Sequence, residues 1–338
     1  MAYSPPLYSR SRVDRAGRAM AEGTASLEER FIINDWRTSH ALPLNVVYMA
    51  LKRLGSATDK SALFSQRIKR LPSIGIKFRR NPRMKLTRMQ DLGGCRVVLR
   101  EASLIKELGK RYKDSRIITH ELVRSYDYLA EPKPDGYRGA HLIFKYTGTR
   151  PSAYDGQFIE LQIRTRLQHG WSMAVETVDH LLNQGLKVGG GDAEWKRFFA
   201  LMGTCHALSE NTPPVPGTPT DMPTLSREVR ELAKSLRVKA RLKGVQAAQR
   251  AMDHEDLRGM DYFLLVLSAK DKYTMIRGYR QREIESARKE YVELEAQDNV
   301  DVVLVRVQDA QSLRQAYPSY FMDTTQFLNS LDELLSHT

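Results

Sequence analysis

The chain contains little cysteine and no long apolar run. Two of its 338 residues are cysteine, Cys95 and Cys205, and two thiols alone cannot build a disulfide framework or a zinc site. The longest purely apolar runs, such as residues 262–267, are far shorter than the roughly 20 residues that a membrane-spanning helix needs. Residues 1–20 are polar and dotted with arginine, without the apolar stretch of a secretory signal. We therefore expect a reducing, cytoplasmic setting and no membrane partner.

Acidic residues are scarce where basic residues are densest. The net charge is +13, and residues 60–100 contain twelve Lys or Arg but a single acid, Asp91. Such density is typical of a protein that binds a polyanion, either nucleotide phosphates or nucleic acid. A solvated basic face would show the same composition, so the charge alone does not decide. The lone carboxylate among the cations makes this segment the first candidate for a site.

The hydrophobic pattern predicts an α/β fold, a mixed sheet flanked by helices. Helical periodicity covers residues 26–58 and continues over 62–68, after which Pro72, Gly75 and Pro82 predict a loop-rich basic stretch. Strands are predicted at residues 95–99, 116–123, 140–146 and 157–165, and helices at 104–112 and 167–182. A turn at 154–156 joins the last two strands into a hairpin. Alternating strands and helices favour one mixed domain that ends near residue 183.

We predict four segments along the chain. Residues 1–25 form a disordered leader, and residues 26–184 form the main domain with N-terminal helices. Residues 185–225, which include three consecutive glycines and five prolines between 212 and 223, form a linker with a short helix. Residues 226–338 form a charged helical arm and a small α/β unit, with strands at 262–268, 273–278 and 300–307 and helices at 283–297, 310–316 and 324–335.

The first candidate motif is a set of polar side chains at offsets that can surround a triphosphate. They are Arg67, Lys69, Ser73, Lys77 and Arg80. Lysine acts as a flexible point charge on phosphate and arginine as a bidentate fork. Because basic loops are common, this motif is weak by itself.

The second motif is Asp91, followed by two glycines and Arg96, at the entry to the predicted strand 95–99. A carboxylate beside glycines, which let a substrate approach the backbone, suits a Mg²⁺ ligand. An aspartate that only forms a turn or caps a helix is the alternative.

The third motif is a loop punctuated by proline and glycine that leads into the strand at 140–146. It carries Lys133, Tyr137 and His141. A nucleotide base can stack on a tyrosine ring while Lys or His beside it holds phosphate. A β-turn with a packing tyrosine is the alternative, although the long pattern makes this motif more specific than the first two.

The fourth motif places three polar side chains on one face of a strand. Glu160, Gln162 and Arg164 follow the period of two, and such a face would be costly in a core. We expect it to line a polar cleft. His169 and Glu176 lie seven residues apart on one face of the next helix, where they either support the cleft or form a structural salt bridge.

These motifs together resemble the RelA/SpoT alarmone-synthetase domain over roughly residues 60–180. DLGGCRVVL (91–99) resembles its strand entry, KPDGYRGAH (133–141) its tyrosine loop, and IELQIRTRLQH (159–169) its Glu-x-Gln strand. The order and approximate spacing also agree. The resemblance extends to the stand-alone, synthetase-only group of small and toxic alarmone synthetases, and it implies a nucleotidyltransferase-like fold.

The resemblance implies an enzyme that transfers the β,γ-pyrophosphate of ATP to a ribose 3′-hydroxyl of GDP or GTP. It assigns Arg67 and Arg96 to the adenine, and Lys69, Lys77 and Arg80, with Ser73 beside them, to the ATP phosphates. It assigns Asp91 and Glu160 to Mg²⁺ and catalysis. It assigns Lys133, Tyr137 and His141, with Gln162 and Arg164, to the acceptor, and His169 and Glu176 to support.

The sequence departs from the family on the acceptor side, where Arg138-Gly139-Ala140 follows the tyrosine. An extra cation there leaves open a toxin-like enzyme that modifies the 3′ end of tRNA. A catalytically inactive regulator that binds nucleic acid is a further alternative, opposed by the presence of both carboxylates. A homo-oligomer and an antitoxin or regulatory partner also stay open. No His-Asp hydrolase constellation precedes the motifs, so we do not expect alarmone hydrolysis.

Overall fold

The computed structural model describes residues 3–115, 120–182, 186, 190–236, 238–239, 242, 260–268, 273–295, 297, 300–306 and 324–336. The chain divides into two compact units. Unit 1 comprises Met1–Asp127 and Gly139–Arg164, and unit 2 comprises Tyr128–Arg138 and Thr165–Thr338. Within the described residues, no helix is long and apolar enough to cross a membrane.

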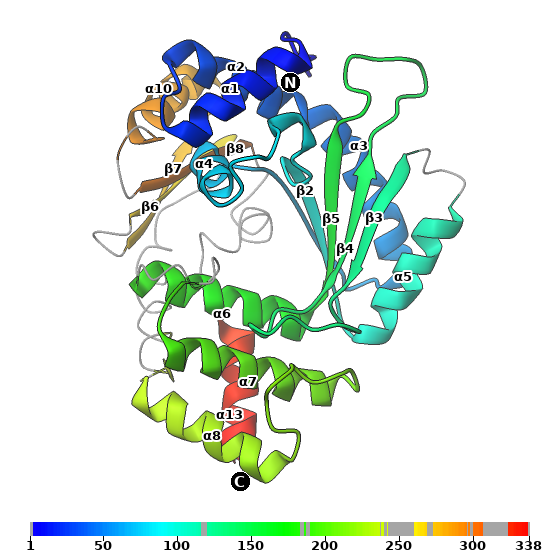
Figure 1. Ribbon diagram of the computed structural model, residues 1–338, viewed down its shortest axis with the longest axis vertical. Coiled ribbons are helices and arrows are strands. Elements are labelled where there is room, and N and C mark those ends of the chain that lie inside the picture. Colours follow the sequence, from blue (N-terminus) through cyan, green and yellow to red (C-terminus); the bar gives the residue numbers. More distant parts are fainter. Residues whose placement is uncertain are drawn as a thin grey trace. The chain divides into compact units, whose positions relative to one another are not determined.

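Unit 1 is built on a five-stranded sheet with helices around it (Figure 1). Its elements are α1 (Arg10–Glu22), α2 (Leu27–Ser39), α3 (Ala41–Thr58), β1 (Leu63–Ile68), α4 (Leu71–Arg80), the short 3₁₀ helix η1 (Leu86–Arg88), β2 (Gly93–Leu99), α5 (Ala102–Asp114), β3 (Glu121–Asp127), β4 (Ala140–Lys145) and β5 (Phe158–Thr165). The strand order is β1-β2-β5-β4-β3. The pairs β1–β2, β3–β4 and β4–β5 are antiparallel. The predicted mixed α/β class is confirmed.

The two faces of this sheet differ in polarity. On one face, Cys95, Val97, Ile159 and Leu161 are buried, and helices α3 and α5 contact β2 there. Packing is close at Gly93, where a Cβ atom would lie 3.5 Å from Leu44 Cβ on α3 and 2.7 Å from Ile159 Cδ1 on the neighbouring strand β5. The alternation of side chains along a strand then places the charged residues of β2 and β5 on the opposite face.

Helix α1 occupies the segment that was expected to be a disordered leader, so that expectation was wrong. Val13 and Ala16 are buried, and α1 contacts α2 and α4. A Cβ atom on Gly17 would lie 2.9 Å from Leu86 Cβ, which shows how closely the helix packs. Small residues carry most of this contact, and small residues give a weak hydrophobic signal in the sequence.

Two further predictions in unit 1 were wrong. Within the predicted helical segment 62–68, residues 63–68 form strand β1 and not a helix, because they pair with β2 from Leu63 opposite Val98 onward. Residues 72–80 are helical and not a loop. Pro72 lies in the first turn of α4, where its missing N–H has no intrahelical acceptor to lose, and Ile74 and Phe78 are buried on the inner face.

Other predicted elements of unit 1 are confirmed. Helices are present at α2, α3 and α5, strands at β2, β4 and β5, and β4 and β5 pair antiparallel as the predicted hairpin. Strand β3 begins at Glu121, later than the predicted strand 116–123, and residues 116–119 lie outside the described residues.

Unit 2 contains a helical cluster and a small sheet. Its elements are α6 (Arg166–Leu182), α7 (Ala193–Ser209), α8 (Met222–Ser235), β6 (Tyr262–Ser268), β7 (Tyr273–Tyr279), the 3₁₀ helix η3 (Gln281–Glu283), α10 (Ile284–Glu295), β8 (Val300–Arg306) and α13 (Thr325–Ser336). Helix α6 contacts α7 and α13, and α8 also contacts α7 and α13, around a buried core that includes Phe198, Leu225 and Phe327. Helix α6, predicted as the end of the main domain, thus packs with the helices that follow it.

The small sheet has the order β7-β6-β8 and is antiparallel. Helix α10 contacts β6 and β8, and Leu264 and Val266 are buried with Tyr291 against them. The predicted strands and the helices at 283–297 and 324–335 are therefore confirmed. Most of the predicted charged arm after α8 (residues 243–259) and the predicted helix 310–316 lie outside the described residues.

Candidate functional site

Asp91 lies between two of the predicted phosphate-binding lysines. Lys69 follows β1 directly, and its backbone N–H donates to the carbonyl oxygen of Leu92 at 2.7 Å. Its Nζ lies 3.0 Å from Asp91 Oδ2, while Lys77 Nζ on α4 lies 2.7 Å from Asp91 Oδ1. Each carboxylate oxygen therefore accepts a charge-assisted hydrogen bond from a different ammonium group.

The surroundings of Asp91 favour its charged form. Burial opposes ionisation, but the charges and hydrogen bonds of Lys69 and Lys77 outweigh it and lower the pKa of Asp91 to about 2. Burial also lowers the pKa of Lys69, against the stabilising charge of Asp91. The carboxylate is thus ionised at neutral pH, and its two oxygens are occupied by the two lysines.

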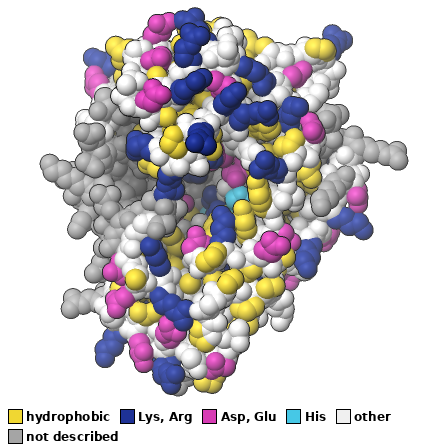
Figure 2. Space-filling view, in the orientation of Figure 1, with side chains coloured by type: hydrophobic (Ala, Val, Ile, Leu, Met, Phe, Trp, Pro, Cys, Tyr) yellow, Lys and Arg dark blue, Asp and Glu magenta, His cyan; other side chains and the backbone are white. Residues whose placement is uncertain are grey.

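Helix α4 presents polar side chains on the side that carries Lys77. Ser73 precedes Lys77 by four residues and Arg80 follows it by three, spacings that share one helix face. The apolar residues Ile74 and Phe78 anchor the other face. Lys and Arg side chains gather around α4 on the surface shown in Figure 2.

Arg67 and Arg96 lie on the same face of adjacent strands. In the β1–β2 register, Arg67 is opposite Gly94 and Ser65 is opposite Arg96. Residues 65 and 67 point to one face of β1, and directly opposed residues share a face. Gly94 has no side chain, so this face of β2 is open at the position opposite Arg67.

A carboxylate–histidine pair lies farther across the sheet. Glu160 Oε1 on β5 lies 2.9 Å from His141 Nδ1 on β4, and Gln162 Nε2 donates to Glu160 Oε2 at 2.8 Å. Burial tends to raise the pKa of Glu160, but the hydrogen bond and charge of His141 outweigh it, so the pKa lies below its usual value. The charge of Asp91 acts in the opposite direction, which shows that the two carboxylates are within electrostatic reach.

Gln162 connects this pair to the arginines. Its Oε1 accepts a hydrogen bond from Arg96 Nε at 3.2 Å and another from Arg164 Nη2 at 3.2 Å. The predicted polar face of β5 is therefore one hydrogen-bonded network with β2 and β4. Such a network fixes the direction of the Glu160 carboxylate before any substrate binds.

The donor set suits a magnesium ion held partly by a substrate. In the part of the chain that the structure describes, no group of three or more His, Cys, Asp or Glu residues could hold a metal ion alone. Asp91 and Glu160 offer two ionised carboxylates among cations. Magnesium typically binds through one or two carboxylates together with substrate phosphates.

The loop with Lys133 and Tyr137 belongs to unit 2. Lys133 Nζ lies 4.4 Å from the ring centre of Tyr128 and 5.0 Å from that of Tyr137, distances at which a cation is attracted to a ring face. The Tyr137 N–H donates to Asp135 Oδ1 at 2.9 Å. Tyr128, which was not predicted as a site residue, thus contacts both Lys133 and Tyr137.

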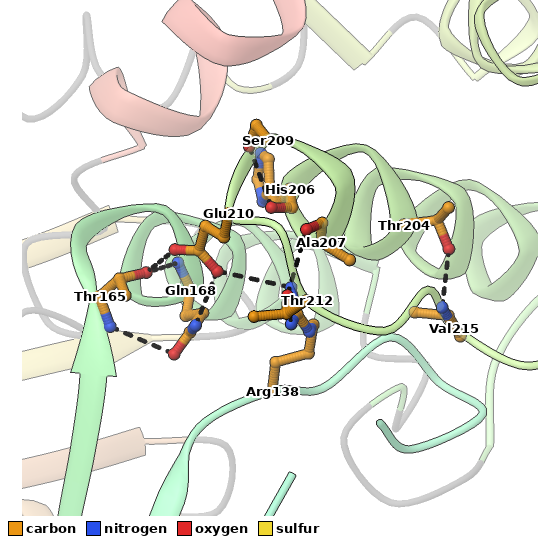
Figure 3. A network of polar contacts seen from close by, with 10 residues as sticks. All are labelled: Arg138, Thr165, Gln168, Thr204, His206, Ala207, Ser209, Glu210, Thr212 and Val215. Atoms are coloured by element: carbon orange, nitrogen blue, oxygen red, sulfur yellow. Dashed lines mark hydrogen bonds and ion pairs between the residues drawn. The ribbon is translucent and has the colours of Figure 1, made fainter. Parts of the chain in front are cut away.

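Arg138 does not present the extra surface cation that the sequence suggested. The residue is 3 % exposed, and its guanidinium hydrogen-bonds Glu210 and Thr212 (Figure 3). A partner 72 residues away in the sequence could not be found from local motifs. The expectation that Arg138 adds a cation for binding a polyanion was therefore wrong.

The two supporting residues lie on helix α6. His169 and Glu176 are half-buried there, and they belong to unit 2 with Tyr137 and not to the sheet of unit 1. Trp171 on the same helix was not predicted as a site residue. Its Nε1 donates to the carbonyl oxygen of Phe199 at 2.8 Å, and its ring lies edge-on to Tyr137. An aromatic residue in a predicted helix is usually interpreted as a core residue, so the contact between Trp171 and the Tyr137 loop was not predicted.

Comparison with known proteins identifies the segment that carries this site. Residues 66–181 match the family model described as "Region found in RelA / SpoT proteins". The chain is 32 % identical over 122 residues to GTP pyrophosphokinase YjbM of Bacillus subtilis, covering 35 % of this chain and 54 % of that protein. It is 28 % identical over 98 residues to GTP pyrophosphokinase YwaC of the same organism, covering 28 % and 44 %.

A solved structure was also found. Small alarmone synthetase 1 from B. subtilis, bound to its product pppGpp, matches with a TM-score of 0.43 and 22 % identity, covering 51 % of this chain and 89 % of that chain. The present chain spans about half the length of the two curated relatives. The motif resemblance is confirmed by the family match: residues 66–181 are a region of the kind found in RelA/SpoT proteins.

Proposed function

We propose that this protein is a pyrophosphokinase that transfers the β,γ-pyrophosphate of ATP to the ribose 3′-hydroxyl of GDP or GTP. The observation that carries the proposal is the ionised Glu160, held by His141 on a sheet face that also bears Arg67 and Arg96. The printed names of two relatives, both GTP pyrophosphokinases, support a guanosine nucleotide as acceptor.

The donor nucleotide is bound by the cations of unit 1. Lys69, Lys77 and Arg80 contact the ATP phosphates, with Ser73 as a hydrogen-bond donor on the same helix face. Arg67 and Arg96, on one face of β1 and β2, flank the adenine. Charge neutralisation and positioning dominate this type of transfer, which accounts for many cations and few carboxylates.

The reaction requires one proton to leave the acceptor. The 3′-oxygen forms a bond to the β-phosphorus of ATP, the bond between that phosphorus and the α,β-bridging oxygen breaks, and AMP leaves. Glu160 accepts the proton of the attacking hydroxyl, and His141 and Gln162 hold its two oxygens in place. A carboxylate ionised at neutral pH is in the correct state for this role.

Asp91 and Glu160 are the residues that would hold Mg²⁺ with the substrate phosphates. When bound, the ion neutralises charge on the transferred group. The remaining assignments concern the acceptor: Tyr137 stacks on the guanine base, and Lys133, His141, Gln162 and Arg164 contact the rest of the nucleotide.

One assay decides the acceptor. Purified protein is incubated with Mg²⁺ and ATP labelled on the γ-phosphate, and GDP, GTP, ATP and deacylated tRNA are offered separately. We expect label on GDP and GTP with one AMP released per transfer. Label on tRNA alone would replace this acceptor with the tRNA 3′ end, and label on no acceptor would overturn the enzyme proposal.

Because Arg138 is buried with Glu210, one observation behind the tRNA alternative no longer holds.

Replacing Tyr137 with leucine tests the acceptor assignment directly. Loss of base stacking, worth about 1–3 kcal/mol per base, should raise the KM for GDP about tenfold or more while the KM for ATP changes less than twofold. Phenylalanine keeps the ring and should retain most of the affinity. Equal changes in both KM values would contradict the assignment.

A further inference from the structure

Helix α7, which follows the matched region, contacts the backbone of the Tyr137 loop. Gly136 has φ of +94°, and a Cβ atom there would lie 2.6 Å from the carbonyl oxygen of Phe199. On the helix side, a Cβ atom on Gly203 would lie 2.8 Å from the carbonyl oxygen of Gly136. Two glycines therefore permit backbone-to-backbone packing, and a side chain at either position would push the loop away from α7.

The other side of Tyr137 is held by a buried ion pair. Arg138 Nη1 lies 3.4 Å from Glu210 Oε2, and the side chains of the pair are 2 % and 7 % exposed. Arg138 also donates to Thr212 Oγ1, and Thr212 Oγ1 in turn donates to the carbonyl oxygen of Ala207 at 3.1 Å. Arg138 is thereby tied to the end of α7 through two residues, Glu210 and Thr212.

Glu210 collects further hydrogen bonds from the start of α6. Gln168 Nε2 donates to Glu210 Oε2 at 2.8 Å, and Thr165 Oγ1 donates to Oε1 (Figure 3). Glu210 is the C-cap of α7, where the helix dipole disfavours a negative charge. The cost of burying the Glu210 charge is offset by its hydrogen bonds to Arg138, Gln168 and Thr165. These contacts, and not an interaction with the dipole of α7, account for a carboxylate at this position.

A buried ion pair of this kind is weak evidence for stability, because desolvation can exceed the attraction. What it does specify is geometry. Tyr137 stands between Gly136 and Arg138, both fixed from α7 and its C-terminal extension, and its ring lies edge-on to Trp171 with centres 6.3 Å apart. The direction of the tyrosine ring therefore depends on residues 193–212.

We propose that Glu210 is a positioning residue for acceptor binding, acting through Arg138 on the Tyr137 loop. The inference rests on the proposed function for the role of Tyr137, and it extends the functional machinery beyond residues 66–181 to α7 and the turn after it. It also gives Arg138 a structural role in place of contact with a polyanion.

The test is Glu210→Gln, which removes the charge and keeps the size. Because a small displacement of a binding group can cost up to about 10²-fold, we expect the KM for GDP to rise about tenfold, with the KM for ATP changed less than twofold. Glu228→Gln is the matched control. It breaks the Arg197–Glu228 pair between α7 and α8, whose Nε–Oε1 distance is 2.6 Å, and it should leave both KM values unchanged.

A second readout does not depend on activity. Trypsin cleavage between Arg138 and Gly139, mapped by mass spectrometry, should be several-fold faster in Glu210→Gln than in the wild type and Glu228→Gln, because the Arg138 guanidinium loses its charged partner. If Glu210→Gln does not fold, Thr212→Val removes the neighbouring hydroxyl with a smaller perturbation and should show the same split in KM. The effect of Arg138→Gln combined with Glu210→Gln should be smaller than the product of the two single effects, since both changes break the Arg138–Glu210 ion pair.

The two proposals fail in different ways. Wild-type transfer of label to GDP, with cleavage after Arg138 and the KM for GDP unaffected by Glu210→Gln, would overturn the positioning role and leave the proposed function intact. A parallel rise in the KM for ATP and GDP would also overturn it. No transfer by the wild type to any acceptor would overturn the proposed function and with it the acceptor role of Glu210, while faster cleavage would still show that Glu210 holds the loop.

Discussion

Replacing Glu160 with glutamine should lower the rate of pyrophosphate transfer by about 10²–10⁴-fold, the range typical of a lost general base. Glutamine can keep hydrogen bonds to His141 and Gln162, so the polar face of the sheet should keep its arrangement. It cannot accept the proton of the attacking hydroxyl at neutral pH. The measurement is AMP formation with both substrates saturating, which reports the chemical capacity of the site apart from substrate affinity.

Glu121→Gln is the control for this change. Glu121 is also a sheet carboxylate, but it lies on the edge strand β3 in an exposed pair with Lys145 at 3.3 Å. We expect its removal to alter the rate less than twofold. A Glu160→Gln enzyme that retains more than about a tenth of wild-type activity would assign the proton to another group, and His141 would be the next candidate.

Asp91→Asn should both remove activity and change the response of the protein to acid. Under the proposed function, losing a ligand to Mg²⁺ costs several kcal/mol of transition-state stabilisation, a fall of about 10²–10³-fold in rate. In the free protein, the pKa of Asp91 is lowered to about 2 from 3.8. Its charge therefore contributes stability above about pH 4, and that contribution is lost as the pH falls from about 4 towards 2.

The acid effect is measured by urea unfolding at several pH values. At pH 5 the variant should be less stable than the wild type by about 2 kcal/mol, the free energy that corresponds to this pKa difference. The gap should shrink as the pH approaches 2.5, because the wild type then loses the same charge. Glu121→Gln is again the comparison, and a gap that does not depend on pH would show that Asp91 stabilises the fold without its charge.

The residues of the sheet site could be found from the sequence because strand periodicity is local. Alternation along β5 was enough to place Glu160 and Gln162 on one face, and the β-branched run in β2 was enough to place Arg96. The ion pairs between Asp91 and its two lysines could be found only from the structure, because the sequence patterns of β1 and α4 had been assigned wrongly. Proline occurs in the first turn of a helix as well as at helix breaks. The residues around Pro72 did not show which of the two applied.

Contacts between segments that are distant in the sequence could not be predicted from the sequence. The buried face of α1 consists largely of small residues such as Ala16 and Gly17, whose apolar surface is too small to stand out in a window of sequence. Arg138 resembled a surface cation because its partner Glu210 lies in a proline-flanked segment with no recognisable motif. A charge acquires its role from the partner that packs against it, and sequence spacing does not report that partner.

Both oxygens of the Asp91 carboxylate are occupied by the ammonium groups of Lys69 and Lys77 in the free protein. Under the proposed function, the same two ammonium groups would also bind the phosphates of ATP, and their hydrogen bonds to Asp91 would then weaken and leave its oxygens available to a divalent ion. Binding of ATP and of the ion is then thermodynamically linked, and each must raise the affinity for the other by the same factor. Under the proposed function, the protein would therefore bind magnesium more tightly in the presence of ATP than in its absence.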